Sequence, residues 1–222
     1  MQKLNLRRCG IIEDVGIIAS ADLSENLVGR NVRDIAEALP KSNLQDLALY
    51  NASLGSEGAK CLASALIVDA THLKKLDICN NNVRDAGAIE FANALSQNSC
   101  ALKWLSLSHN HVGPAGAKRL ASALVVNYTL DEIRMGSNAI GPEGFGAIGS
   151  SLQQNSTLTG LYVRSNGIGG EGVQAFAECA LRGLRCLGLQ HNEIGNHGCQ
   201  CLATGISARL STITTLSSTE TT

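Results

Sequence analysis

The chain has 222 residues, of which 44% are hydrophobic, and it carries a formal net charge of −1 at pH 7. This composition supports a sizeable folded core and argues against an intrinsically disordered chain. The near-neutral charge provides no basic surface of the kind that binds nucleic acid, so no nucleic-acid partner is expected. Because only 3% of the residues are aromatic, the core is expected to consist of small aliphatic side chains.

The sequence also argues against export, membrane insertion and cofactor binding. The first ten residues include two adjacent arginines rather than an apolar run, and no apolar stretch approaches the roughly 18 residues of a membrane span. The eight cysteines include no C-x-x-C pair, so we expect free thiols in a reducing compartment, a cytoplasmic location and no bound metal. Glycosylation-type triplets at Asn51, Asn127 and Asn155 are then interpreted as chance.

A short phrase recurs eight times along the chain: an apolar anchor, a residue three places later that is usually Asn, and an aliphatic residue two places further on. From Leu23 onward the anchors lie 26, 29, 29, 28, 28 and 26 residues apart. Such self-similarity predicts a stack of units that each bury an apolar face against their neighbours. The anchors are Leu6, Leu23, Leu49, Ile78, Leu107, Met135, Val163 and Leu189.

The units differ in completeness when they are taken in chain order. The first anchor is followed by the second after only 17 residues, too few for a full helix, so the first of seven to eight units is expected to be defective. The third unit has Ala52 in place of the usual Asn, and the fourth has Arg84 in place of a usual Gly. The repeats are expected to form one domain over residues 1–206. Ten of the residues in 207–222 are Ser or Thr, which predicts a frayed tail, although Leu210 and Ile213 could begin another strand.

The unit from Leu102 to Leu130 shows the elements most clearly. Leu105 and Leu107 alternate with polar residues, which predicts a half-buried strand that runs parallel to its equivalents. Pro114 then favours the first turn of a helix. The helix is expected to bury Ala117, Leu120, Ala121 and Leu124 and to expose Lys118, Arg119 and Ser122.

The recurring asparagines are predicted to form a structural ladder. An Asn side chain has two donors and an acceptor, so it can bond backbone groups of two neighbouring turns where strand passes into loop. An unpaired buried backbone group costs about 1–3 kcal/mol, and removing one such Asn is expected to cost about 2 kcal/mol. The ladder residues are Asn26, Asn81, Asn110, Asn138, Asn166 and Asn192.

These positions carry a resemblance to a known family. The run Leu102-x-x-Leu105-x-Leu107-x-x-Asn110-x-Val112-Gly113-x-x-Gly116-Ala117-x-x-Leu120-Ala121-x-Ala123-Leu124 resembles the ribonuclease-inhibitor-type leucine-rich repeat. The same type is found in the sensor arrays of NOD-like receptors and in Ran GTPase-activating proteins. The resemblance implies an α/β fold: a right-handed solenoid, or horseshoe, with parallel strands on the concave face and helices on the convex face. The imperfect ends suggest a fragment or one part of a larger receptor or scaffold.

Motifs that suggest phosphate binding, metal binding or catalysis are explained by the repeat pattern or by surface residues. Of two G-x-G-x-x-G strings, the one at Gly167-Gly169-Gly172 aligns with glycines of the repeat, so phosphate binding is not expected. His109 and His111 have no nearby acidic or thiol partner that would complete a metal site. No catalytic constellation is present, and the chain is not expected to be an enzyme.

The outward side chains of the strands are the candidate site. They include Trp, Tyr and Arg, which dominate protein-binding hot spots. We therefore expect a non-catalytic module that binds a protein partner on its concave face; the alternative is a Ran-type activator of GTP hydrolysis by a small GTPase, although such activators end in an acidic stretch that this chain lacks. The predicted contact residues are Tyr50, Lys75, Asp77, Trp104, Glu132, Arg134, Tyr162, Arg164 and Gln190.

Overall fold

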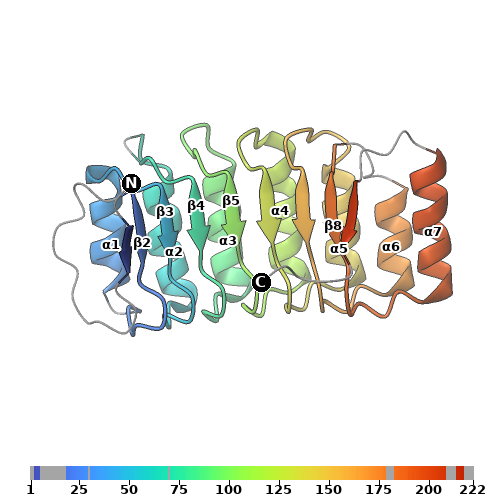
Figure 1. Ribbon diagram of the computed structural model, residues 1–222, viewed down its shortest axis with the longest axis horizontal. Coiled ribbons are helices and arrows are strands. Elements are labelled where there is room, and N and C mark those ends of the chain that lie inside the picture. The colour runs from blue at the N-terminus through green and yellow to red at the C-terminus, as the bar shows by residue number, and fades with distance from the viewer. Residues whose placement is uncertain are drawn as a thin grey trace.

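The computed structural model describes residues 3–5, 19–29, 31–69, 71–178, 183–208 and 214–217. Within them the chain forms one sheet of nine parallel strands that follow one another in sequence order (Figure 1). Each strand is three residues long. The strands are β1 (Lys3–Asn5), β2 (Ser20–Asp22), β3 (Asp46–Ala48), β4 (Lys75–Asp77), β5 (Trp104–Ser106), β6 (Glu132–Arg134), β7 (Gly160–Tyr162), β8 (Cys186–Gly188) and β9 (Thr215–Ser217).

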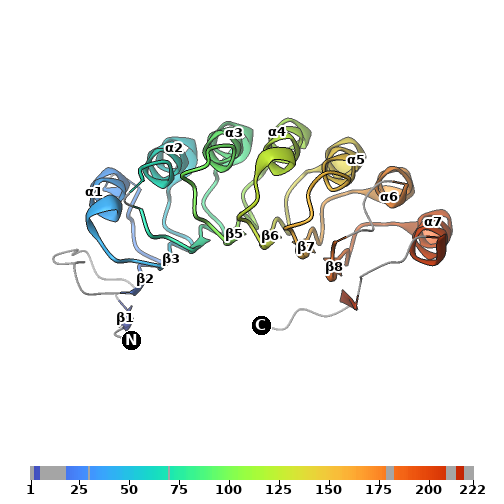
Figure 2. The same ribbon diagram turned by 90° about the horizontal axis from the view of Figure 1, so that it is seen from above.

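A helix follows each strand from β2 to β8. In Figure 2 the helices lie along the outer side of an arc and the strands along its inner side. The predicted curved α/β solenoid, with strands on the concave face and helices on the convex face, is thus confirmed. The helices are α1 (Val32–Ala38), which continues into the short 3-10 helix η1 (Leu39–Lys41), α2 (Gly55–Leu66), α3 (Arg84–Leu95), α4 (Pro114–Val126), α5 (Gly141–Ser151), α6 (Gly169–Ala177) and α7 (Gly195–Ala208).

The core lies between the sheet and the helices. The middle residue of each strand from β3 to β8 is buried, as alternation along a strand requires: Leu47, Leu76, Leu105, Ile133, Leu161 and Leu187. The helix α4 begins at Pro114 and buries the four residues predicted from its periodicity, Ala117, Leu120, Ala121 and Leu124. Its polar side chains Lys118, Arg119 and Ser122 are exposed, also as predicted.

The two ends of the chain are described in part. The anchor Leu6 of the first unit, with Cys9 and Ile11, lies outside the described residues, so its predicted defect stays a prediction. In the segment 207–222, where a tail was predicted, α7 continues to Ala208 and β9 pairs with β8. Leu210 and Ile213 lie outside the described residues.

One repeat also caps the helix of the next. The first turn of α4 contains no acidic residue, but Asp85 from α3 reaches it. Asp85 Oδ1 accepts hydrogen bonds from the backbone N–H groups of Gly113, at 2.6 Å, and Gly116, at 3.0 Å. A Cβ at Gly116 would lie 2.7 Å from this oxygen, so glycine is needed there. Asp85 therefore satisfies donors at a helix start that would otherwise lack partners.

The backbone at Arg84 explains why four other repeats carry glycine at this position; Gly113, before α4, is extended instead. Arg84 has a φ of 57°, and Gly55, Gly141, Gly169 and Gly195 have values from 62° to 65° at the equivalent place. This left-handed conformation costs an L-residue about 1–2 kcal/mol, whereas glycine adopts it freely. Because glycine also loses more backbone entropy on folding, we expect Arg84→Gly to stabilise the protein by about 0.5–1 kcal/mol. The midpoint of urea unfolding measures this change.

Gly169→Ala is the matched control for that substitution. Gly169 has the same conformation, and a Cβ there would meet nothing within 4 Å, so the backbone alone decides the effect. Alanine should lower the free energy of unfolding by about 1 kcal/mol. An unfolding midpoint for Arg84→Gly at or below that of the natural chain would contradict this explanation.

Candidate protein-interaction surface

Three columns of side chains run across the strands on the side away from the helices. The strand register places Lys75, Trp104, Glu132, Gly160 and Cys186 side by side in the first column. The second column holds Asp77, Ser106, Arg134, Tyr162 and Gly188, and the third lies two residues further along each chain segment. These columns form the concave surface. The nine predicted contact residues all lie in them: Tyr50, Lys75, Asp77, Trp104, Glu132, Arg134, Tyr162, Arg164 and Gln190.

Five of these residues form one connected group, which we call the aromatic–cation cluster: Lys75, Trp104, Glu132, Arg134 and Tyr162. Lys75 Nζ lies 4.6 Å from the centroid of the Trp104 ring. Arg134 Cζ lies 5.3 Å from the same ring and 5.0 Å from the Tyr162 ring, so its guanidinium bridges the two aromatic residues. Each cation sits within the range of attraction to an aromatic face.

Glu132 holds the centre of the cluster in place. Its Oε1 accepts a hydrogen bond from Trp104 Nε1 at 2.8 Å and another from Arg134 Nε at 2.7 Å. The Glu132 side chain is only 25% exposed, and the Arg134 side chain is 43% exposed. A Cβ at Gly160 would lie 2.9 Å from Glu132 Cγ, so the missing side chain on the next strand provides the space that Glu132 occupies.

The same relation holds one strand further along. A Cβ at Gly188 would lie 2.9 Å from Tyr162 Cδ1, so this glycine makes room for the tyrosine ring. Partial burial raises the pKa of Tyr162 above its usual value, and a hydrogen bond with Cys186 and the charge of Glu132 act in the same direction. Arg134 opposes these effects. The phenol is therefore a neutral hydrogen-bonding group on this surface.

The other four predicted contact residues surround this cluster. Tyr50 is 38% exposed, and Asp77 accepts a hydrogen bond from the Cys79 backbone N–H at 3.0 Å, which gives that carboxylate a structural role as well. Arg164 and Gln190 are half-buried in the third column. Sequence reasoning did not predict that Gly160 and Gly188 would determine how the side chains lie.

The ladder asparagines bond to the backbone of two repeats. Asn110 Oδ1 accepts from the N–H groups of Asn81, at 2.9 Å, and Val83, at 3.2 Å. Its Nδ2 donates to the carbonyl oxygens of Ile78 and Ser108. Asn81, Asn138, Asn166 and Asn192 each make the same kind of bonds to the preceding repeat, and Asn26 bonds within its own turn.

The sequence analysis did not predict a second asparagine column, which lies where a helix passes into the next strand. Asn127 and Asn155 follow the helices α4 and α5 and are both 3% exposed. Asn155 Nδ2 donates to the carbonyl oxygens of Leu124 and Asn127, and its Oδ1 accepts from the N–H of Leu158. The signal was present as the two triplets Asn127-Tyr-Thr and Asn155-Ser-Thr. These asparagines connect helix ends to the next strand.

The glycine strings belong to the repeat. Gly167 and Gly169 have φ values of 62° and 63° at the turn into α6, and the string from Gly144 to Gly149 lies inside α5. Among the residues that the structure describes, no three His, Cys, Asp or Glu side chains are grouped so as to hold a metal ion. The six described cysteines are free thiols. None of the helices in the described ranges is long and apolar enough to cross a bilayer.

The family profile described as "Leucine Rich repeat" matches residues 1–19, 69–92, 98–121, 154–177 and 182–203, which is about half of the chain. The chain belongs to the leucine-rich repeat family. The profile names no subclass, so the ribonuclease-inhibitor type stays a prediction. No curated protein sequence matches this leucine-rich repeat protein.

Solved structures with similar folds include "Leiomodin-1 Actin-Binding Site 2 (ABS2)", with 24% identity, a TM-score of 0.49, and coverage of 59% of this chain and 79% of that one. The tropomodulin C-terminal domain of Caenorhabditis elegans has 13% identity and a TM-score of 0.47, and covers 80% of this chain and 95% of its own. The "TLR13-ssRNA13 complex" has 18% identity and a TM-score of 0.40, with coverage of 89% and 34%. Similarities this low carry no information on what this chain binds.

Proposed function

We propose that this leucine-rich repeat protein is a non-catalytic module that binds a protein partner on its concave surface, as part of a larger receptor or scaffold in the cytoplasm. The observation that carries the proposal is the aromatic–cation cluster. It combines Trp104, Tyr162 and Arg134, the residue types that contribute most to protein-binding hot spots. The six free thiols support a reducing compartment.

The cluster is also organised before any partner arrives. Its side chains stand on four hydrogen-bonded strands, β4 to β7, and Glu132 fixes the orientation of both Trp104 and Arg134. A preorganised surface loses little conformational entropy on binding. The six strands from β3 to β8 span about 25–30 Å at roughly 4.8 Å per strand, a length that suits one face of a small protein.

The test removes the two central groups together. In affinity capture followed by mass spectrometry, Trp104→Ala with Arg134→Ala should reduce the recovery of specific partners by more than about tenfold, because each hot-spot residue contributes about 2 kcal/mol or more. The thermal unfolding midpoint should change little, because both side chains lie outside the core.

Tyr128→Ala with Arg119→Ala is the matched control. It also removes one aromatic residue and one arginine, but Tyr128 is 67% exposed beyond the end of α4 and Arg119 lies on the outer face of that helix. Partner recovery should be unchanged. If the concave variant also kept every partner, the binding surface would have to lie on the helices or loops.

The alternative function, activation of GTP hydrolysis by a small GTPase, is separated by a different readout. The chain is mixed with a panel of GTP-loaded small GTPases, and phosphate release is followed. The proposed non-catalytic role predicts no acceleration. Stimulated turnover by any member of the panel would replace it with the activator role.

A further inference from the structure

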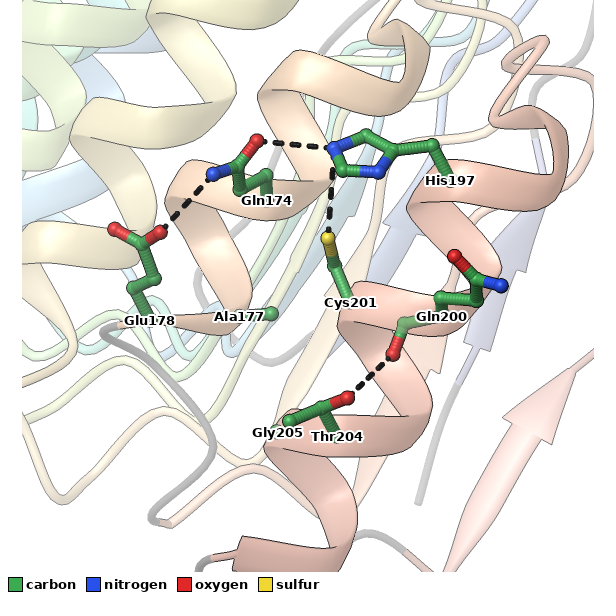
Figure 3. Close-up of a pocket in the computed structure, with 8 residues that line it drawn as sticks. All are labelled: Gln174, Ala177, Glu178, His197, Gln200, Cys201, Thr204 and Gly205. Carbon is green, nitrogen blue, oxygen red and sulfur yellow. Dashed lines mark hydrogen bonds between the residues drawn. The ribbon is translucent and has the colours of Figure 1, made fainter.

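A cavity of about 360 Å³ lies between the helices α6 and α7 (Figure 3). Figure 2 shows that these helices lie on the convex side, away from the strands. Gln174 lines the cavity from α6, Glu178 from the position directly after that helix, and His197 and Cys201 from α7. His197 and Cys201 are four residues apart, so they share one face of the helix. Figure 3 shows that the imidazole, the thiol and the Gln174 amide point toward one another.

A nitrogen, a sulfur and an oxygen atom that could each bind a metal ion lie close together in this cavity. His197 Nε2 lies 3.1 Å from Gln174 Oε1 and 3.7 Å from Cys201 Sγ. On a tetrahedral zinc ion, bond lengths of about 2.0–2.1 Å to nitrogen and about 2.3 Å to sulfur place those two atoms about 3.6 Å apart. An oxygen and a nitrogen ligand lie about 3.4 Å apart on the same ion. The sulfur–nitrogen separation of 3.7 Å is therefore close to that of a chelate, and the nitrogen–oxygen separation of 3.1 Å would lengthen by about 0.3 Å on binding.

We propose that His197, Cys201 and Gln174 form a binding site for a borderline divalent transition-metal ion, with Zn²⁺ as the matching ion. Imidazole nitrogen and thiolate sulfur are the ligands that such ions prefer, and the amide oxygen completes the protein's set. The imidazole binds through Nε2 with its proton on Nδ1. The thiol loses its proton to solvent as the sulfur–metal bond forms, and no oxidation or reduction takes place.

The surroundings support these three residues. Glu178 Oε1 accepts a hydrogen bond from Gln174 Nε2 at 3.3 Å, which turns the amide oxygen toward His197. Such outer contacts orient metal ligands in known sites. His197 Cδ2 lies 3.7 Å from the place where a Cβ at Gly170 would stand, so the imidazole packs over the start of α6. The cavity leaves space for water as a further ligand. A bound ion would then join the helices of the last two repeats.

Cobalt titration of the whole chain tests the proposal. Co²⁺ is added to the reduced protein, and the thiolate-to-cobalt charge-transfer absorption is recorded. One equivalent should saturate the signal, and Zn²⁺ should abolish it by displacement. Gln174→Ala should weaken binding, because it removes the third protein ligand, but should leave the thiolate-to-cobalt absorption in place. Cys201→Ser and His197→Ala should each remove the saturable signal, and circular dichroism verifies that these variants fold.

Cys199→Ser is the matched control, because Cys199 is an exposed thiol on the same helix that does not line the cavity. This variant should bind Co²⁺ like the natural chain. Zn²⁺ should also raise the thermal unfolding midpoint of the natural chain and of Cys199→Ser, but not that of Cys201→Ser, because an ion that binds only the folded state stabilises it. Absence of a saturable signal in the natural chain, or its persistence in Cys201→Ser, would overturn the proposal.

Discussion

Phe145→Ala is expected to lower the free energy of unfolding by about 3–5 kcal/mol. Phe145 in α5 is fully buried, and its ring stacks on that of Phe176 in α6 with centroids 4.3 Å apart and an interplanar angle of 8°. Alanine would remove the ring and leave a cavity between the two helices. It would also remove the contact of the aromatic pair, which contributes about 0.5–1.5 kcal/mol beyond burial.

Comparison of the repeats alone would suggest the opposite result, because alanine occupies this position in three preceding units: Ala59, Ala88 and Ala117. The unit of α5 compensates for its large residue with Gly149, at a position where alanine is usual. A Cβ at Gly149 would lie 2.8 Å from Phe176 Cα. The α5–α6 contact thus combines a large and a small residue, and alanine at position 145 does not fit it.

Urea unfolding followed by circular dichroism measures the loss. Because each repeat contacts only its neighbours, weakening the α5–α6 contact should also let the C-terminal repeats unfold before the rest, and the transition should broaden or divide. Phe145→Leu keeps most of the volume and should cost about 1–1.5 kcal/mol. Equal unfolding midpoints for Phe145→Ala and the natural chain would show that the ring stack contributes nothing.

The architecture could be predicted from the sequence because each repeat contains the same pattern of strand, turn and helix. Leu105 and Leu107 show the period of a strand, Pro114 marks a helix start, and the same pattern recurs six times from Leu23 onward. At the start of α2, α5, α6 and α7 a glycine adopts a left-handed backbone, and Arg84 adopts the same conformation without one, whereas Gly113 before α4 is extended. Local conformation and burial can therefore be predicted from the sequence of a single repeat.

The contacts between repeats were less predictable. The concave position of Trp104 and Arg134 follows from alternation, but their link through Glu132 depends on the empty place at Gly160, 28 residues away in the chain and one strand away in space. Similarly, the spacing of His197 and Cys201 is visible in the sequence, whereas Gln174 joins them only through the packing of α6 on α7. Such contacts depend on the orientation of side chains toward the neighbouring strand or helix.

Asn110→Ala is expected to cost about 3 kcal/mol, more than the roughly 2 kcal/mol predicted from the sequence. The Asn110 side chain is fully buried and makes four hydrogen bonds to backbone groups, three of which belong to the preceding repeat, at Ile78, Asn81 and Val83. Alanine leaves these groups without their partner in a place that water does not reach. The loss is measured as the change in the urea unfolding midpoint.

Asn138→Ala provides the comparison that isolates the role of burial. Asn138 occupies the next rung and makes the same bonds, including those from the N–H groups of Asn110 and Val112, but it is half-buried rather than fully buried. Water can partly replace its side chain, so its removal should cost about 1–2 kcal/mol. If both substitutions cost the same, the number of hydrogen bonds rather than the exclusion of water would determine what each rung contributes.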